Sequence, residues 1–405
     1  MAGVLGMILA GGEGSRLRPL TDSRTKPAVP FGGSYRLVDF ALNNFVNADL
    51  MKIYVLTQFK SQSLYVHMKK GWNITGITDR FIDPIPAQMR MGKRWYDGTA
   101  DAIYQNIRFI ELAEPEQVCI FGSDHIYKMD VKQMLDYHKE KEAQLTVSAI
   151  RMPLHEASAF GVIEVDAEGR MVGFEEKPAN PKSIPGDPEH ALVSMGNYVF
   201  ETDVLCRELE EDAENENSSH DFGKDIIPKL VPQGKVFVYD FNTNVIPGEQ
   251  NNGYWRDVGT IESYWQAHMD LLSEDAPFSL YNRQWQLHTF YPPLPPATVL
   301  DSEECKVDIN NCMVSAGSYI RGARIHKSVL GFRTNVDCCS TISESIILGD
   351  VKIGANCSIR RAIIDKNVMI APGTVIGEDL EEDRKKYHVS DEGIVVIPKG
   401  AKIGY

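Results

Sequence analysis

The chain has 405 residues, of which 43% are hydrophobic and 24% charged, and its formal net charge is −14. Because one hydrophobic core rarely serves more than about 250–300 residues, we expect two domains. The negative charge argues against nucleic acid or an anionic membrane as a partner. The N-terminus lacks the basic region of a signal peptide, and no apolar run reaches about 18 residues, so we expect a cytoplasmic protein without a transmembrane helix.

Short apolar runs alternate with helix-like segments over the first 265 residues or so. Strands are expected at 4–8, 53–57, 118–121 and 145–150. Helices are expected at 60–70 and from Asp130, a helix-capping residue, to about Ala143. This alternation is typical of an α/β domain with a mostly parallel sheet, whose ligands bind at the carboxyl ends of the strands.

A glycine-rich stretch, LAGGEGSRLRPLTDSRTKP, follows the first expected strand at residues 9–27. It carries three glycines and then four cations, and such a turn lets backbone N–H groups approach a phosphate that Arg and Lys neutralise. It fits neither the P-loop nor the GxGxxG pattern. On spacing alone a purely structural turn remains open, whereas the cations favour a nucleotide triphosphate site.

Cysteines, acidic runs and a proline cluster give three further expectations. Seven scattered cysteines without a CxxC pair predict free thiols in a reducing compartment. The acidic runs at 208–216 and 378–383 predict solvated surface. The sequence YPPLPP at 291–296 cannot continue a helix or a central strand, so it predicts a boundary between domains 1–290 and 291–405.

A repeat occupies the C-terminal part. Nine apolar residues follow one another at steps of six or five, so that every third one lies 17 positions further on. One apolar residue per short strand at a fixed period is typical of a hexapeptide β-helix with triangular coils, whereas a helix needs a period near 3.6. The nine are Leu330, Val336, Ile342, Ile347, Ile353, Ile359, Ile364, Ile370 and Ile376.

Eight segments, in order, closely resemble bacterial ADP-glucose pyrophosphorylases, also called glucose-1-phosphate adenylyltransferases. The resemblance runs from about residue 5 to about residue 396. It implies a Rossmann-like nucleotidyltransferase domain with a mostly parallel sheet, followed by a left-handed parallel β-helix. The segments are LAGGEGSRLRPLT…TKPAVPFGG, WYDGTADA, GSDHIY, ASAFGVIEVD, FEEKPANP, SMGNYVF, NSSHDFGKDIIP and YWRDVGT.

The reaction that this resemblance implies joins ATP and glucose 1-phosphate into ADP-glucose and pyrophosphate, for glycogen or another α-glucan. The sugar phosphate attacks the α-phosphorus in line, so no enzyme nucleophile is expected. The matching positions assign nucleotide binding to Leu9, Ala10, Gly11, Gly12, Gly14, Gln88 and Gly98, and glucose 1-phosphate binding to Tyr96, Gly161, Glu176, Lys177 and Ser194.

Four residues are the expected catalytic group. The resemblance implies that Arg16 contacts the leaving pyrophosphate and that Lys26 lies near the α-phosphate. It also implies that Asp124 and Asp257 bind Mg²⁺. The two aspartates are 133 positions apart, so only folding can bring them together. Without the resemblance, either aspartate is more often a turn or helix-cap residue. We interpret His125 as structural.

Members of the family are usually homotetramers controlled by sugar phosphates and AMP. The residues expected to contact effectors, rather than to be plain surface charge, are Arg24, Arg36, Arg360, Arg361 and Lys366. The chain departs from the enteric type at Glu13, Ser23 and Pro30, where that type has a basic residue, a lysine and a histidine. The loss of these cations implies weaker activation by fructose 1,6-bisphosphate.

Three other functions stay open. The first is a related enzyme that uses UTP, GTP or dTTP. The second is a regulatory subunit without catalysis, which the presence of the expected catalytic and substrate-binding residues argues against: Arg16, Lys26, Asp124, Lys177 and Asp257. The third is a β-helix acyltransferase, for which His326 is the one candidate near the repeat and which leaves the glycine-rich stretch unexplained.

Overall fold

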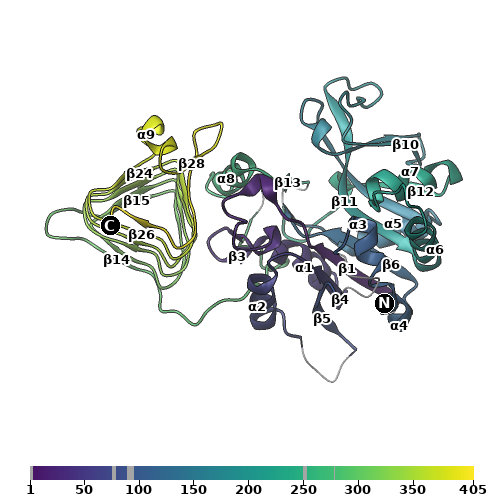
Figure 1. Cartoon of the computed structure of the whole chain (residues 1–405), viewed down its shortest axis with the longest axis horizontal. Coiled ribbons are helices and arrows are strands. Elements are labelled where there is room, and N and C mark those ends of the chain that lie inside the picture. The colour runs from purple at the N-terminus through teal and green to yellow at the C-terminus, as the bar shows by residue number, and fades with distance from the viewer. Residues whose placement is uncertain (1–2, 75–78, 89–94, 250–252, 278) are drawn as a thin grey trace.

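The computed structural model describes residues 3–74, 79–88, 95–249, 253–277 and 279–405. Figure 1 shows an α/β domain beside a triangular stack of coils seen end-on, with an extended segment running between them. Among the described residues, no helix combines the length and the apolar character that a membrane span requires.

Four parallel strands form the half of the main sheet that holds the glycine-rich stretch. They lie in the order β6 (Gln117–Gly122), β1 (Val4–Ala10), β4 (Lys52–Thr57), β5 (Phe81–Pro86). Strand β1 is apolar and almost wholly buried, as expected for a central parallel strand covered on both faces. The strands predicted at 4–8, 53–57 and 118–121 are therefore confirmed.

The other half of the main sheet is mixed rather than parallel. Strand β11 (His190–Glu201) runs antiparallel to β6, to β8 (Leu145–Pro153) and to β9 (Gly161–Val165). Strand β10 (Met171–Glu176) is antiparallel to β9, and β12 (Val236–Asp240) is parallel to β8. Strand β8 confirms the strand expected at 145–150.

A small antiparallel ribbon lies apart from this sheet. It pairs β7 (His125–Tyr127), which follows β6 directly, with β13 (Trp255–Asp257). Its register sets Asp257 opposite His125. The ribbon therefore brings two distant segments of the chain together at the carboxyl end of β6. A further short pair joins β2 (Pro30–Phe31) and β3 (Tyr35–Arg36).

The two expected helices are present. The helix predicted at 60–70 is α2, and Asp130 caps α5 by accepting a hydrogen bond from the Lys132 backbone N–H at 3.0 Å. Helix α5 ends at residue 140 rather than near 143, because Glu142 takes a left-handed φ of 47°. The helices are α1 (Leu37–Asn47), α2 (Gln62–Gly71), α3 (Thr99–Tyr104), α4 (Ile107–Ala113), α5 (Val131–Glu140), α6 (Thr202–Ala213), α7 (Ile227–Leu230), α8 (Ile261–Asp270) and α9 (Leu380–Arg384).

The C-terminal domain is a parallel β-helix whose three sides are sheets of short strands. One side is β14 (Thr298–Leu300), β17 (Tyr319–Arg321), β20 (Asn335–Val336), β23 (Lys352–Ile353), β26 (Met369–Ile370) and β30 (Lys402–Ile403). The second is β15 (Asp308–Asn310), β18 (Arg324–His326), β21 (Thr341–Ser343), β24 (Ser358–Arg360) and β27 (Val375–Ile376). The third is β16 (Met313–Val314), β19 (Val329–Leu330), β22 (Ile346–Ile347), β25 (Ala362–Ile364), β29 (Val395–Ile397) and β28 (His388–Val389).

The predicted repeat matches the coils of this β-helix. Leu330 pairs with Ile347 and Ile347 with Ile364, each 17 positions apart, and the other two series stack in the same way. All nine residues are buried in one core. The hexapeptide β-helix is confirmed.

The two domains share a buried apolar interface. Leu17, Phe31 and Phe40 of the first domain pack in one cluster with Ile346 and Ile363 of the β-helix. The described chain between α8 and β14 has neither helix nor strand, and the boundary predicted at 290/291 falls within it. That boundary stays a prediction.

The acidic runs are not solvated throughout. Glu208 is only 2% exposed because it lies on the inner face of α6, where Lys229 binds its carboxylate at 2.9 Å. Asp383 is also buried, and it accepts a hydrogen bond from the Gly377 backbone N–H. The prediction of surface acids is wrong at these two positions, since charge runs do not reveal a partner that is distant in sequence.

The prediction of seven free thiols is wrong at two positions. Cys305 and Cys339 form a disulfide, and their Cα atoms lie 5.6 Å apart. Cys305 lies in the turn between β14 and β15 and Cys339 in the turn between β20 and β21, so both lie at the same corner of the β-helix. The remaining five cysteines are free.

A buried histidine at the domain interface predicts acid sensitivity. His268 donates from Nδ1 to the Tyr264 carbonyl and accepts from the Gly32 N–H, so the neutral ring is satisfied. Burial lowers the pKa of His268 from 6.5 to about 4, and the hydrogen bond to Tyr264 opposes this only in part. The unfolded chain therefore takes up a proton that the folded chain refuses as the pH falls from 6.5 towards 4.

When the pH is lowered from about 8 to about 5, the free energy of unfolding of the wild type should fall by about 2 kcal/mol because of His268. The His268→Gln variant keeps a donor and an acceptor but does not titrate. Urea unfolding at the two pH values checks this, and the variant should lose correspondingly less stability. Equal pH dependence in the two proteins would contradict the assignment.

Candidate active site

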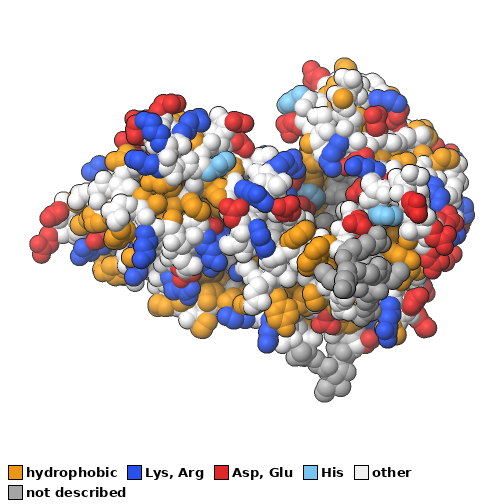
Figure 2. Space-filling model, viewed as in Figure 1, with side chains coloured by type: hydrophobic (Ala, Val, Ile, Leu, Met, Phe, Trp, Pro, Cys, Tyr) orange, Lys and Arg blue, Asp and Glu red, His pale blue; other side chains and the backbone are white. Residues whose placement is uncertain are grey.

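A cavity of about 550 Å³ opens at the carboxyl ends of β1 and β6. Figure 2 shows the surface hollowed between the lobe that carries β10 and the region around β13, with charged side chains at the rim. Nine of the predicted site residues line the cavity: Leu9, Gly11, Gly12, Lys26, Tyr96, Gly98, Asp124, Glu176 and Lys177.

The glycine-rich stretch folds back onto Lys26. Gly14 has a left-handed φ of 65°, and a Cβ there would lie 2.9 Å from Cβ of Lys26, so this position requires glycine. The Thr25 hydroxyl is within hydrogen-bonding distance of the carbonyls of Ala10 (3.2 Å) and Gly12 (3.3 Å). The loop therefore holds Lys26 beneath the backbone of residues 10–14.

Lys26 joins the two predicted metal-binding aspartates. Its Nζ donates to Oδ2 of Asp124 at 2.9 Å and to Oδ1 of Asp257 at 3.0 Å, and Lys26 is only 6% exposed. Burial disfavours the ammonium, but the two carboxylates outweigh it and raise the pKa of Lys26. Burial works against the Asp124 carboxylate as well, yet Lys26 lowers the pKa of Asp124 well below its usual range. Lys26 and Asp124 are therefore both charged at neutral pH.

His125 and Arg16 complete this charged group. His125 Nε2 lies 3.6 Å from Asp124 and 3.9 Å from Asp257, so a residue that we interpreted as structural lies in the site. Arg16 lies 4.0 Å from Asp257, and its side chain is 63% exposed at the cavity edge. Asp124, His125 and Asp257 are one of two groups of described residues whose side chains can hold a metal ion.

The donor set fits a hard divalent cation. Two carboxylate oxygens already hold one cation, the Lys26 ammonium, at 2.9 and 3.0 Å, which shows that both point at a common location. Mg²⁺ prefers oxygen ligands of this kind and takes one or two carboxylates together with phosphate oxygens. The aspartates, 133 positions apart in sequence, meet because β13 pairs with β7.

The opposite wall holds a lysine in an uncommon backbone conformation. Lys177 has a left-handed φ of 49°, and its N–H donates to the Phe160 carbonyl at 3.0 Å. Such a conformation costs about 1–3 kcal/mol and is concentrated at functional sites. Its Nζ binds the Glu176 carboxylate at 2.7 Å, so the pair enters the cavity as one unit.

Tyr96 and Gly98 are fixed by contacts with other elements. The Tyr96 N–H donates to the Gln58 side chain, and Asn106 donates to the Tyr96 hydroxyl at 2.9 Å. A Cβ at Gly98 would lie 2.1 Å from the His220 carbonyl oxygen, so only glycine permits this approach.

The remaining predicted residues lie outside the cavity lining. Gln88 is exposed just beyond the end of β5, while Gly161 and Ser194 lie behind the sugar-side wall, where a Cβ on Gly161 would meet Glu176 at 2.9 Å. The others outside the lining are Ala10, Gly14, Arg16 and Asp257.

The sequence analysis missed several lining residues. Thr99 and Asp221 are joined by a hydrogen bond of 2.9 Å and stand within the quoted segments WYDGTADA and NSSHDFGKDIIP, which offered a signal. Tyr198 stands within the quoted segment SMGNYVF and had the same signal. Gln58 and Phe59 had none, because no spacing rule marks a single aromatic or amide residue as a cavity wall.

Three of the predicted effector residues, Arg24, Arg36 and Lys366, lie close together at the domain interface, and two lie outside this group. Arg24 is buried, and its Nη2 binds both oxygens of Asp365 at 2.8 Å. Burial lowers the pKa of Arg36 to about 10; Asp39 opposes this shift and nearby Arg24 adds to it. Burial also lowers the pKa of Lys366, with a contribution from Arg36 and Arg24, so these three cations lie close together.

Arg361 and Arg360 belong to other surroundings. The Arg361 guanidinium lies 4.7 Å from the centre of the Trp265 ring and 3.7 Å from Glu392. Arg360 is exposed at the end of β24. Arg361 therefore also contacts the first domain, through Trp265 of α8.

Family comparisons agree with this architecture and this site. A family model described as "Nucleotidyl transferase" matches residues 5–274, and one described as "GlmU-like, C-terminal hexapeptide" matches residues 295–397. The chain is therefore a nucleotidyltransferase whose catalytic domain is followed by a left-handed hexapeptide β-helix.

Relatives that match the chain over its full length identify its family among the nucleotidyltransferases. The chain is 87% identical to the glucose-1-phosphate adenylyltransferase of Photobacterium profundum and 77% identical to a glucose-1-phosphate adenylyltransferase 1 of Vibrio vulnificus. It is 50% identical to the glucose-1-phosphate adenylyltransferase of an Anaeromyxobacter species. In each comparison 100% of both chains is covered. The chain belongs to the glucose-1-phosphate adenylyltransferase family.

Proposed function

We propose that this protein transfers AMP from ATP to α-D-glucose 1-phosphate and releases ADP-glucose and pyrophosphate, for the synthesis of glycogen or another α-glucan. The observation that carries the proposal is that Lys26 and Asp124 line one cavity, where Lys26 also binds Asp257 just behind the lining, and that the opposite wall presents Lys177. The site thus presents a lysine on each of two opposite walls, as the binding of two polyanionic substrates requires.

The residues divide between the two substrates. The backbone of Gly11 and Gly12 holds the nucleotide, Arg16 neutralises the leaving pyrophosphate at the cavity edge, and Lys26 neutralises charge on the α-phosphate. Lys177 binds the phosphate of glucose 1-phosphate, and Glu176 accepts hydrogen bonds from glucose hydroxyls. The attacking phosphate oxygen is already ionised, so the transfer needs no general base.

We further propose that Asp124 and Asp257 hold Mg²⁺. A bound divalent cation neutralises charge on the phosphates of the nucleotide. Asp124 stays ionised at neutral pH because Lys26 lowers its pKa, so no proton has to leave Asp124 before a cation binds. Lys26 fixes the separation of the two aspartates before any ligand enters.

A nucleotide panel tests the proposed activity. Glucose 1-phosphate is supplied with ATP, UTP, GTP or dTTP in separate assays, and pyrophosphate release is measured. ATP should give the highest kcat/KM. A preference for UTP, GTP or dTTP would assign the chain to another nucleotide specificity, and the absence of release with every nucleotide would favour a regulatory subunit.

Lys177→Ala should raise the KM for glucose 1-phosphate by about 10–100-fold, because a charge-assisted hydrogen bond contributes about 1.5–3 kcal/mol. The KM for ATP should change far less. The exposed Lys182, which pairs with Glu164 on the same lobe, gives the matched control Lys182→Ala. An unchanged KM for glucose 1-phosphate in Lys177→Ala would remove this residue from the sugar-phosphate site.

We also propose that the protein is a cytoplasmic homotetramer whose activity responds to sugar phosphates and AMP. Support comes from the cations Arg24, Arg36 and Lys366 at the domain interface. Arg24 Nη1 is buried and has no hydrogen-bond partner among the described residues, which suits a phosphate-bearing effector. We include Arg361, which contacts Trp265 of α8, and the exposed Arg360 among the residues that bind effectors.

A further inference from the structure

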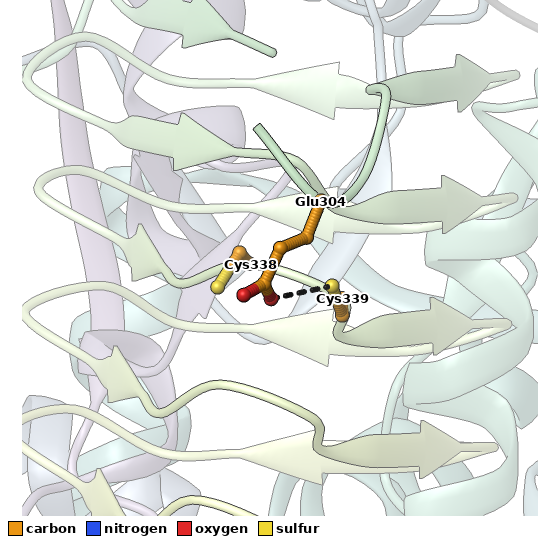
Figure 3. Close-up of side chains that lie close together, drawn as sticks. All are labelled: Glu304, Cys338 and Cys339. Carbon is orange, nitrogen blue, oxygen red and sulfur yellow. Dashed lines mark hydrogen bonds between the residues drawn. The ribbon is translucent and has the colours of Figure 1, made fainter. Parts of the chain in front are cut away.

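Three cysteines and a glutamate gather on one turn of the β-helix, far along the chain from the residues of the active site. The ligand atoms of Glu304, Cys338 and Cys339 all lie within 4.8 Å of one another. Figure 3 shows the Glu304 side chain reaching from a neighbouring segment towards both cysteines. Cys305, next to Glu304, is bonded to Cys339 and so brings a third sulfur against this group.

The β-helix itself does not require sulfur at this turn. Backbone hydrogen bonds stack the turn on its neighbours, from the Cys339 N–H to the Gly322 carbonyl and from the Asn356 N–H to the Cys338 carbonyl. The equivalent turns 17 positions away read Arg-Gly at 321–322 and Ala-Asn at 355–356. Since these coils stack without cysteine, the cluster calls for an explanation in its own chemistry.

We propose that Cys305, Cys338, Cys339 and Glu304 form a Zn²⁺ site when the Cys305–Cys339 disulfide is reduced. Three thiolates and one carboxylate supply four ligands, the number that a tetrahedral structural zinc site takes. Thiolates select a soft or borderline metal, which favours Zn²⁺ over the Mg²⁺ of the catalytic site. Two segments of the chain, 304–305 and 338–339, already hold the ligands together.

The disulfide and the metal exclude each other. A dithiol reductant gives two electrons and two protons to the Cys305–Cys339 bond, which leaves two thiols and an oxidised dithiol. Zn²⁺ then replaces the thiol protons of Cys305, Cys338 and Cys339, and three protons pass to water. The same turn is thus closed by a sulfur–sulfur bond under oxidising conditions and by Zn²⁺ under reducing conditions.

Metal binding by the full-length protein tests this proposal. The protein is reduced with a phosphine, or left oxidised, and then titrated without oxygen with Zn²⁺ or with Co²⁺ as a spectroscopic substitute. Reduced wild type should bind one Zn²⁺ per chain at this site, and Co²⁺ should give a thiolate-to-metal absorption band of a tetrahedral site. Oxidised wild type should lack that band.

Single variants identify the ligands. Cys338→Ser should weaken Zn²⁺ binding by more than the about 10–100-fold that loss of an outer hydrogen bond costs a metal site. Glu304→Gln should weaken binding while it keeps the thiolate band. Cys312→Ser, which removes a partly buried thiol elsewhere in the β-helix, is the matched control and should bind as wild type does.

Retained catalytic activity shows that each variant is folded, since the cluster lies outside the active-site cavity. If an assay finds no activity in wild type either, circular dichroism replaces it as the folding check. Absence of the band from reduced wild type would overturn the proposal. So would equal Zn²⁺ binding by Cys338→Ser and wild type, or by the oxidised and reduced proteins.

Discussion

Replacing Asp124 by asparagine should lower the rate of ADP-glucose formation by about 10²–10³-fold, the usual effect of removing one preorganised charged group from a transition-state site. Asp124 is one of two carboxylates that hold Lys26, at 2.9 Å, and that we assign to Mg²⁺. The neutral amide preserves the size of the side chain but removes its charge. Lys26 then keeps only Asp257, and the divalent cation loses a ligand.

Steady-state measurement of pyrophosphate release, with ATP and glucose 1-phosphate varied in turn, checks this expectation. The fall should be in kcat, and excess Mg²⁺ should restore part of it if the loss is one of metal affinity. Asp136→Asn is the matched control, because Asp136 is exposed on α5. Turnover within about twofold of wild type for Asp124→Asn would contradict the assigned role.

Sequence periodicity predicted the β-helix well, for a physical reason. Each coil repeats the same backbone path, so a residue that faces the core must recur at a fixed interval, as Leu330, Ile347 and Ile364 do. The central strands were also predictable, because strands buried on both faces are continuous apolar runs. These features depend on local sequence alone.

The proximity of Asp124 and Asp257 could not be predicted from such patterns. Nothing in the spacing of Asp124 and Asp257 indicates that β7 and β13 form a ribbon, so their meeting was expected only through family resemblance. The buried state of Glu208 was missed for a similar reason, since its partner Lys229 follows on another helix. The disulfide was missed because nothing in the sequence indicates that the turn at Cys305 reaches the turn at Cys339, two coils further along the β-helix.

The second large expected effect is on the free energy of unfolding, and it concerns an ion pair at the domain interface. Asp365→Ala should lower the unfolding free energy by about 3–5 kcal/mol, the range for removing one partner of a buried ion pair. Asp365 is fully buried and accepts two hydrogen bonds of 2.8 Å from Arg24, which lies 341 positions away. Its removal leaves Arg24 buried beside Arg36 and Lys366 without that counter-charge.

Arg24→Ala should destabilise the protein less than Asp365→Ala does. The carboxylate left behind still accepts a hydrogen bond of 2.6 Å from the Lys366 backbone N–H and stays close to the remaining cations, whereas Asp365→Ala leaves like charges facing one another. Urea unfolding, followed by a probe in each domain, measures both changes. The exposed pair Arg321–Asp337 supplies the control Arg321→Ala, which should have little effect.

The double variant Arg24→Met/Asp365→Leu separates charge from packing. Apolar side chains of similar volume fill the space without a desolvation penalty, so the double variant should recover most of the stability that Asp365→Ala loses. It should also lose any response to phosphate-bearing effectors, because Arg24 is among the cations proposed to bind them. Equal stability of Asp365→Ala and wild type would show that the ion pair does not hold the domains together. A double variant as unstable as Asp365→Ala would assign the loss to shape rather than charge.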